Sequence, residues 1–176
     1  MQQSTSGETR RLVVVRHAKA EPSAPSDHER ALAERGHGDA ADVGRWLTRQ
    51  EIVADAALVS NALRARETWA RLAAGAEWDV EPDFSAALYA AGPDSAFDLI
   101  RETPASVRTL VVVGHNPTMA YLAELIDDGE GDDEATTSLV SRGFPTSAVA
   151  VFDVAAGWSE LTAGSGTVRH FHVGGS

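Results

Sequence analysis

The sequence predicts an α/β fold, a three-layer α/β/α sandwich with a mostly parallel central sheet. Three short apolar runs, residues 12–15, 56–59 and 110–113, have the composition of strands that are buried on both faces. Each run is followed by a segment with apolar residues at helical spacing, and this alternation favours a parallel sheet covered by helices on both faces. No repeat or long linker divides the 176 residues, which predicts one domain over residues 10–176.

The first half of the domain contains two strand and helix pairs. The valine-rich run at residues 12–15 is followed by a helix predicted over residues 36–50, because apolar side chains recur there every three or four positions. The run at residues 56–59 is followed by a second helix over residues 61–74. Asn61 is placed to cap this second helix.

The middle of the chain continues the alternation. Residues 78–80 form a short strand candidate, and residues 93–102 form a helix that opens on a proline. The run at residues 110–113 is followed by a helix over residues 116–126. An asparagine and a proline open that helix, and they suit its N-cap and its first helical position.

Two further strands are expected near the end of the chain. Residues 148–154 are apolar enough for a buried strand. Residues 167–173 alternate weakly between apolar and polar side chains, which predicts an edge strand that runs antiparallel to its neighbour.

Composition places the chain among cytoplasmic globular proteins. Hydrophobic residues make up 43%, which is enough for a sizeable core. No apolar run could span a bilayer, and residues 1–9 are polar, unlike a secretory signal, so we expect them to form a flexible N-terminal tail. The chain has no cysteine, which excludes disulfides, thiolate metal sites and cysteine nucleophiles.

The charge balance disfavours nucleic acid and membrane partners. The formal net charge is −11, and a chain this acidic repels other polyanions. Part of the excess lies in residues 127–134, which we interpret as a solvated loop, since the spacing of a calcium loop is absent. Any anion site must therefore build its positive potential locally.

Polar side chains follow three of the predicted strands. Arg16 and His17 follow the first strand, Ser60 and then Arg64 follow the second, and His115 follows the third. Ligands of open α/β sheets bind outside the carboxyl ends of the strands, so we expect these five residues to lie together.

The chemistry of this set suits a phosphoryl group. Arginines bind phosphoryl oxygens in pairs of hydrogen bonds, helix N-termini favour anions, and a neutral imidazole can act as a nucleophile. No carboxylate cluster accompanies these residues, and no glycine-rich loop ends in lysine. The sequence therefore gives no support to a magnesium-dependent phosphotransferase.

Three segments resemble a known family. Arg16-His17-Ala18 resembles the Arg-His-Gly signature of the histidine phosphatase superfamily, which has the phosphoglycerate mutase-like fold. Residues 60–68 resemble its second segment, with the second arginine, and residues 114–117 resemble its third, with the second histidine. All three occur in order at strand ends, which makes the resemblance specific.

Within the superfamily the chain is most similar to the small SixA-type phosphohistidine phosphatases. Arg30-Ala31-Leu32 with the later Gly36, and residues 145–148 before a late strand, carry this similarity.

The resemblance implies roles for the strand-end residues. His17 would be the nucleophile that becomes phosphorylated, while Arg16, Arg64 and His115 would bind the phosphoryl oxygens. Water would then release inorganic phosphate, and no metal or organic cofactor is implied. Ser60 and Asn116 complete the predicted phosphate-binding set, and the candidate rim comprises Lys19, Arg30, Thr146 and Ser147.

The chain departs from the family pattern at two positions. Ala18 replaces the signature glycine, which is harmful only if the backbone there has a positive φ. Ala87 stands where many members place a glutamate that protonates the leaving group. Three carboxylates are candidates to replace it: Glu21, Glu81 and Asp83. A missing acid matters less for a protonated phosphoramidate than for an alkoxide, so this departure favours phosphohistidine as the substrate.

Three functions remain open at this point. A metal-independent phosphatase acting on phosphohistidine in a protein ranks first, because the short chain between Arg64 and His115 leaves little room for a cap domain over the site. A phosphatase of small phosphoesters, such as a sugar phosphate or a nucleotide, is the alternative. A module that binds phosphorylated partners without turnover is the third, although binding alone does not require His17.

Overall fold

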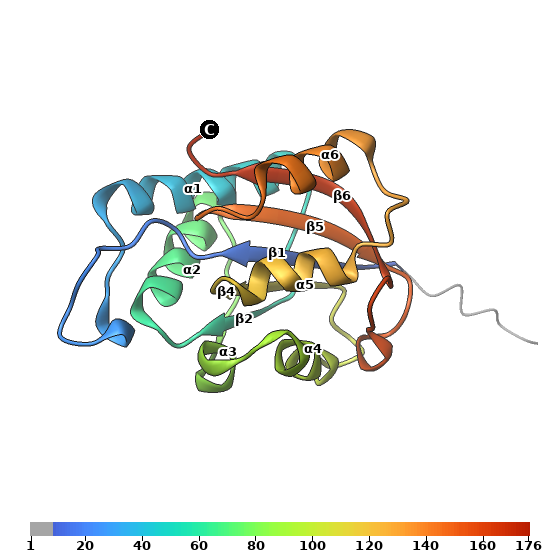
Figure 1. The fold of residues 1–176 in the computed structure, drawn as a ribbon, viewed down its shortest axis with the longest axis horizontal. Helices are drawn as coiled ribbons and strands as arrows, with labels where there is room; N and C mark the ends of the chain where they lie inside the picture. The colour runs from blue at the N-terminus through green and yellow to red at the C-terminus, as the bar shows by residue number, and fades with distance from the viewer. Residues whose placement is uncertain (1–8) are drawn as a thin grey trace, which may run out of the picture.

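The computed structural model describes residues 9–176, which are arranged around one six-stranded sheet (Figure 1). The predicted tail, residues 1–9, lies outside the described residues except for Thr9. The order of strands across the sheet is β3-β2-β4-β1-β5-β6. Their bounds are β1 Arg10–Arg16, β2 Ala56–Ser60, β3 Asp83–Ser85, β4 Thr109–Gly114, β5 Ala148–Val154 and β6 Gly166–Val173.

The sheet is mixed, with its parallel part on one side and its antiparallel part on the other. β1, β2, β3 and β4 run parallel, and Val13 of β1 pairs with Val111 of β4. β5 runs antiparallel to β1, and β6 runs antiparallel to β5 at the edge. The expected antiparallel edge strand is therefore confirmed, and the strand beside it is antiparallel as well.

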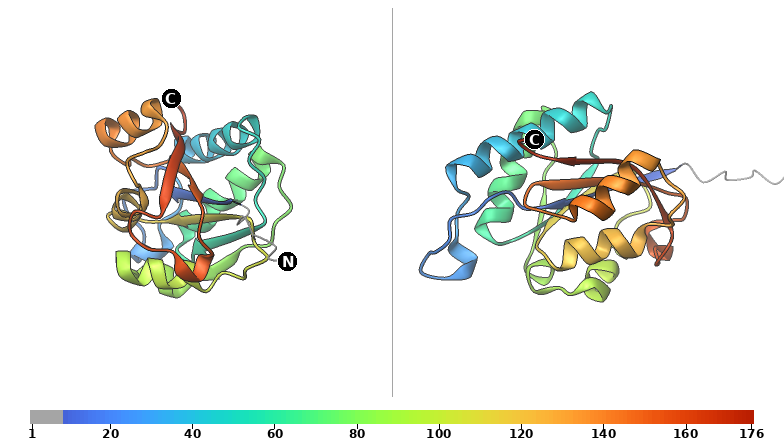
Figure 2. Two further views of the ribbon diagram at one scale, coloured as in Figure 1. Left: turned by 90° about the vertical axis from the view of Figure 1, so that its right-hand side faces the viewer. Right: turned by 45° about the horizontal axis from the view of Figure 1, so that its top comes forward.

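Helices cover both faces of the sheet, which confirms the three-layer sandwich (Figure 2). α1 (Glu34–Arg49) and α2 (Leu63–Ala76) lie on one face. The opposite face is covered by α3 Ala86–Ala90, α4 Pro93–Arg101, α5 Thr118–Ile126 and α6 Asp133–Arg142. Two short 3-10 turns, Asp27–Glu29 and Trp158–Glu160, lie in the connections.

The valine runs divide their side chains between these two faces. Val13 and Val111 pack toward α1 and α2, whereas Val14 and Val112 pack toward the opposite helices. Each buried valine contributes on the order of 1.5–3 kcal/mol of apolar burial. β4 is buried at every residue and β1 is buried from Leu12 to Val15, so the ends of both strands are held firmly in place.

Two glycines permit close backbone contacts that position the site. A Cβ at Gly44 of α1 would lie 2.0 Å from the carbonyl oxygen of Leu72, so α1 and α2 pack backbone against backbone. A Cβ at Gly36 would lie 2.1 Å from the carbonyl oxygen of Lys19. The start of α1 is thereby pressed against the segment that follows β1.

One expectation about the middle of the chain is wrong. Residues 78–80 form no strand, and the strand that pairs with β2 is β3. Trp78 and Val80 instead pack, partly buried, against the apolar core beneath α1 and α2. Packing against this core therefore explains why these residues are apolar although they lie outside the sheet.

Most of the acidic segment at residues 127–134 is loop, and only its last two residues belong to α6. The carboxylate of Asp132 accepts a hydrogen bond from the backbone N–H of Ala135 at 2.9 Å and caps α6. Asp133 and Glu134 lie in the first turn of this helix, where negative side chains are favoured by the helix dipole. Within residues 9–176, no helix is both long enough and apolar enough to span a membrane.

Candidate active site

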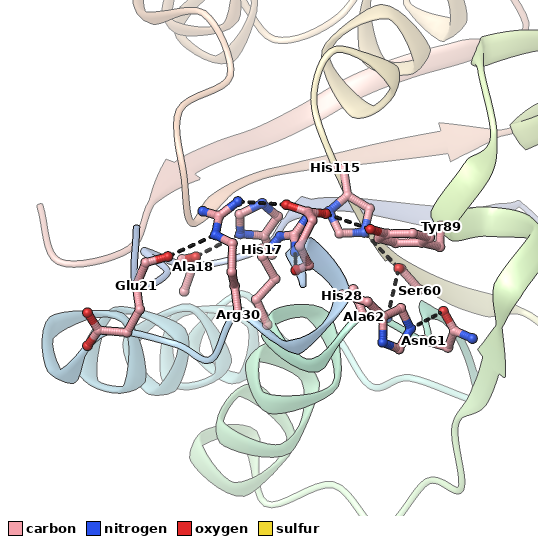
Figure 3. Close-up of polar contacts among 12 residues, drawn as sticks. His17, Ala18, Glu21, His28, Arg30, Ser60, Asn61, Ala62, Tyr89 and His115 are labelled. Carbon is pink, nitrogen blue, oxygen red and sulfur yellow. Dashed lines mark hydrogen bonds and ion pairs between the residues drawn. The ribbon is translucent and has the colours of Figure 1, made fainter. Parts of the chain in front are cut away.

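The carboxyl ends of β1, β2 and β4 bring the predicted strand-end residues together. Arg16 ends β1 and His17 follows it, while Arg64 lies in the first turn of α2 and His115 follows β4. These four residues line one cavity of about 290 Å³. The ring centroids of His17 and His115 are 5.2 Å apart. Ser60, which was predicted to bind phosphate, ends β2 and does not line this cavity; its hydroxyl contacts His115 instead (Figure 3).

The protonation state of His17 can be read from its hydrogen bond. Its Nδ1 lies 2.8 Å from the carbonyl oxygen of Ala18, which can only accept, so Nδ1 carries the proton and Nε2 keeps a free lone pair. Burial lowers the pKa of His17 to about 4, with a smaller contribution from the positive charge of Arg64. The ring is therefore neutral near pH 7.

Backbone contacts fix His17 from both sides. Its N–H donates to the carbonyl oxygen of Gly114 at 3.0 Å, and its carbonyl oxygen accepts from the N–H of Ser147 at 3.2 Å. The last residue of β4 and the residue just before β5 thus hold the backbone of His17 in one place.

His115 is also a neutral imidazole. Its Nε2 lies 2.7 Å from Oγ of Ser60, and its Nδ1 is buried without a partner among residues 9–176. Burial, followed by the charge of the neighbouring His17, lowers the pKa of His115 to about 3. The ring of Tyr89 packs edge-on against it, with centroids 5.4 Å apart.

The two arginines each keep a buried donor free. Nη1 of Arg16 donates to the carbonyl oxygen of Phe144 at 3.3 Å, and Arg64 donates to Asp27 through Nη1 at 2.8 Å and Nη2 at 3.0 Å. The Nε of each arginine has no partner among the described residues. Because a buried N–H without an acceptor costs about 1–3 kcal/mol, both donors favour an anion in the cavity.

The other predicted site residues divide into two groups. The rim residues Lys19, Arg30 and Thr146 line the same cavity as His17, and so does Asn116, which was predicted to bind phosphate. Ser147 does not line it: this residue is buried in a left-handed conformation, with φ of 64°, just before β5. Its contribution is the backbone N–H that bonds to His17.

The two predicted asparagine caps have different outcomes. Asn61 does not cap α2, because its Oδ1 accepts from Nε2 of His28 at 2.9 Å (Figure 3). Oγ of Ser60 accepts from the N–H of Ala62 at 3.3 Å instead. Asn116 lies one residue before the N-cap of α5, which is Pro117 and not Asn116 as predicted, but its Oδ1 accepts from the N–H of Ala120 at 3.2 Å. Its side-chain amide donates to the carbonyl oxygen of Phe144.

Ala18 fits its position without strain. It is absent from the residues with positive φ, and its side chain is fully buried beside Leu32 and Ala40. Its N–H donates to Oγ1 of Thr68 at 3.0 Å. The methyl group that replaces the signature hydrogen is therefore accommodated.

None of the three carboxylates considered as replacements for the missing acid lines the cavity: Glu21, Glu81 and Asp83 all lie elsewhere. The carboxylate that reaches the site is Asp27, in the loop between β1 and α1, and the hydroxyl of Tyr89 donates to it. Asp27 also forms an ion pair with Arg30, at 2.9 Å. No sequence pattern links Asp27 to Arg64 or Tyr89, which lie far along the chain.

Comparison with known proteins shows which family this chain resembles. A model of the histidine phosphatase superfamily (branch 1) matches residues 12–88. The uncharacterized protein Rv1276c of Mycobacterium tuberculosis is 38% identical over 160 residues, which cover 90% of this chain and 99% of the relative.

Two solved structures extend the likeness over nearly the whole chain. SixA from Nakamurella multipartitia is 28% identical, with a TM-score of 0.84, and the match covers 97% of this chain and 99% of that one. The protein histidine phosphatase SixA complexed with tungstate shares the fold, at 24% identity, a TM-score of 0.72, and coverage of 93% and 96%. The chain therefore belongs to the histidine phosphatase superfamily and is a phosphatase.

Proposed function

We propose that this phosphatase works without a metal, through a phosphohistidine intermediate on His17, and that its substrate is phosphohistidine in a protein. One observation carries the proposal. His17 is a buried, neutral imidazole whose proton is held on Nδ1 by the Ala18 carbonyl, so Nε2 is left as a nucleophile beside Arg16 and Arg64.

In the first step, Nε2 of His17 forms a bond to phosphorus while the bond from phosphorus to the leaving imidazole breaks. The leaving ring keeps the electron pair, and it departs neutral because it is protonated beforehand. Negative charge on the transferring oxygens is stabilised by the guanidinium groups of Arg16 and Arg64 and by His115. For Nδ1 of His115 to donate to an oxygen, Ser60 must donate its proton to Nε2.

In the second step, a water oxygen bonds to phosphorus and the bond from phosphorus to Nε2 breaks. The electron pair returns to His17, one proton of the water passes to solvent, and inorganic phosphate leaves. The same donors serve both steps, because the phosphoryl oxygens stay in the same place while the groups on either side exchange.

Three features support a phosphoryl group presented by another protein. The cavity of about 290 Å³ lies at the lower end of the range of pockets that enclose a whole small molecule. Lys19 and Arg30 add positive charge at its rim, against the acidic balance of the chain. Ala87 supplies no proton to a leaving group, which suits a protonated imidazole better than an alkoxide.

The proposal is tested by trapping the intermediate. Wild-type protein, His17→Ala and a control, His170→Ala on β6, are incubated with a radiolabelled histidine-phosphorylated protein and quenched in alkali. We expect label on the wild type and the control, none on His17→Ala, and phosphate release unaffected by a chelator. Turnover by His17→Ala would contradict the mechanism, and phosphate binding with neither label nor turnover would indicate a binding module.

The substrate class is tested by rates on a panel. The histidine-phosphorylated protein is compared with sugar phosphates, nucleotides and a chromogenic phosphoester under one set of conditions. We expect the highest kcat/KM for the phosphohistidine protein. A strong preference for one small phosphoester would overturn the protein substrate and leave the nucleophile in place.

A further inference from the structure

Asp27 contacts three side chains of the site although it does not line the cavity. It lies in the short 3-10 turn between β1 and α1, and its side chain is 53% exposed. The base of its loop is closed by a bridge between Ala20 and Leu32, and the N–H of Leu32 donates to Glu67 of α2. The loop is therefore anchored, and Asp27 projects from a fixed frame.

The first contact is with Arg64. Nη1 of Arg64 donates to the backbone oxygen of Asp27 at 2.8 Å, and Nη2 donates to its Oδ2 at 3.0 Å. A guanidinium has five N–H donors in one rigid plane, so two bonds to one residue fix the orientation of that plane. The Nε–H of Arg64 stays available on the side of the arginine that Asp27 does not occupy.

The other contacts reach across the site. Oδ1 of Asp27 accepts from Nη1 of Arg30 at 2.9 Å, and Oδ2 accepts from the hydroxyl of Tyr89 at 2.5 Å. The ring of Tyr89 packs against His115. One carboxylate thus links the arginine of α2, the rim arginine and, through Tyr89, the second histidine.

Asp27 keeps its charge throughout the working pH range. The hydrogen bond from Tyr89, followed by that from Arg30, holds the pKa of this carboxyl far below its usual range, and Arg64 acts in the same direction. A group so firmly ionised is a poor proton donor. Its contacts therefore indicate a structural task within the site rather than acid catalysis.

We propose that Asp27 is a positioning residue for phosphoryl transfer: it orients the guanidinium of Arg64 and, through Tyr89, the ring of His115 toward the transferring oxygens. This inference rests on the proposed function, because it assumes that both groups bind those oxygens. Charge on the oxygens changes most in the transition state, so loss of orientation lowers kcat more than it raises KM.

A different role for Asp27 would leave a different signature. If its carboxylate only neutralised part of the positive charge around the cavity, removing that charge would tighten binding of every oxyanion. If Asp27 only held the loop in place, any substitution that weakens the loop would lower activity to the same extent. Binding of vanadate, which can take a five-coordinate geometry, and of inorganic phosphate distinguishes these roles without turnover.

The experiment compares Asp27→Asn with Glu29→Gln, which removes the same charge from an exposed side chain of the same turn. For Asp27→Asn we expect kcat to fall about 10–100-fold, with KM changed by less than about threefold. In titration calorimetry we expect the affinity of Asp27→Asn for vanadate to fall by a factor similar to the fall in kcat. Its affinity for phosphate should change by less than about threefold. Tyr89→Phe, which removes one of the donors to Asp27, is expected to lose about 3–10-fold in kcat.

Three outcomes overturn the inference: unchanged kcat in Asp27→Asn, tighter binding of both oxyanions, or an equal loss in Glu29→Gln. Thermal unfolding of each variant shows whether the fold is intact, and Tyr89→Phe tests the same network if Asp27→Asn is unfolded. If the wild type itself releases no phosphate, the proposed function fails. The vanadate and phosphate titrations then still decide the role of Asp27.

Discussion

Oγ of Ser60 lies 2.7 Å from Nε2 of His115 and also accepts the N–H of Ala62, so one buried hydroxyl joins the start of α2 to the second histidine. Ser60 is fully buried at the end of β2. The strand thereby fixes both a helix terminus and the orientation of an imidazole.

Ser60→Ala should loosen His115 and weaken the fold. The change removes the partner of Nε2, so we expect kcat to fall about tenfold, and the buried groups left without a bond to cost about 1–3 kcal/mol of unfolding free energy. Steady-state kinetics and urea denaturation measure the two effects. Ser138→Ala on α6 is the control, and wild-type kcat in Ser60→Ala would show that His115 needs no such support.

The pH dependence of activity should reflect the lowered pKa of His17. Nε2 is nucleophilic only when the ring is neutral, and burial lowers the pKa to about 4. We therefore expect the acid limb of kcat/KM near pH 4, after correction for the ionisation of the substrate, rather than near 6.5. Titration of the ring signals by NMR, with His17→Ala to identify them, measures the same value directly. A midpoint near 6.5 would contradict it.

Stability should fall with acid over the same window. The pKa of His17 and that of His115 are both lower in the folded protein, at about 4 and about 3, than in the unfolded chain, at about 6.5. Between these values the unfolded state binds more protons, so the unfolding free energy decreases as the pH falls. We expect His17→Ala to make this dependence shallower between pH 6.5 and 4. An unchanged slope would show that His17 is protonated equally in both states.

The part of the site that follows strands could be predicted from the sequence. Residues 12–15, 56–59 and 110–113 lie within β1, β2 and β4, because a valine-rich run buried on both faces has few alternatives in an α/β chain. Once these strands are parallel neighbours, their carboxyl ends meet. The convergence of Arg16, Arg64 and His115 follows from topology.

Other parts could not be predicted, for physical reasons. β3 is three residues long and two of these are exposed, so it has no apolar pattern that would indicate a strand. Trp78 lies nearby and suggests a buried strand, but it packs against the core under α2 and lies outside the sheet. Asp27 reaches Arg64 through a loop whose path is set by backbone contacts such as that between Gly36 and Lys19. The spacing of apolar residues in the sequence does not predict such backbone contacts.

Restoring the signature glycine should weaken the protein without improving catalysis. Ala18 has no positive φ, and its buried methyl group contacts Leu32 and Ala40. Ala18→Gly loses this contact and adds freedom to the unfolded chain, so we expect a loss of about 1–2 kcal/mol in unfolding free energy with kcat unchanged. Urea denaturation measures it, with Ala105→Gly at an exposed turn as the control for backbone entropy. Increased stability would show that the alanine is strained.

Supplying a carboxylate at position 87 should change substrate preference. Ala87 is exposed on α3, two residues before Tyr89, whose ring packs on His115. An acid there could protonate an alkoxide leaving group, so we expect Ala87→Glu to raise kcat on a sugar phosphate at least about tenfold. The rate on a histidine-phosphorylated protein should stay the same, because its leaving imidazole is already protonated.

The matched control is Ala86→Glu, the adjacent exposed position on the same helix, which adds the same charge one residue away. Added negative charge near an anionic substrate raises KM in either variant, so kcat is the informative quantity. An equal effect in both variants would point to charge alone. A gain on both substrates in Ala87→Glu would show that loss of the leaving group limits phosphohistidine turnover too, and that the alanine confers no preference.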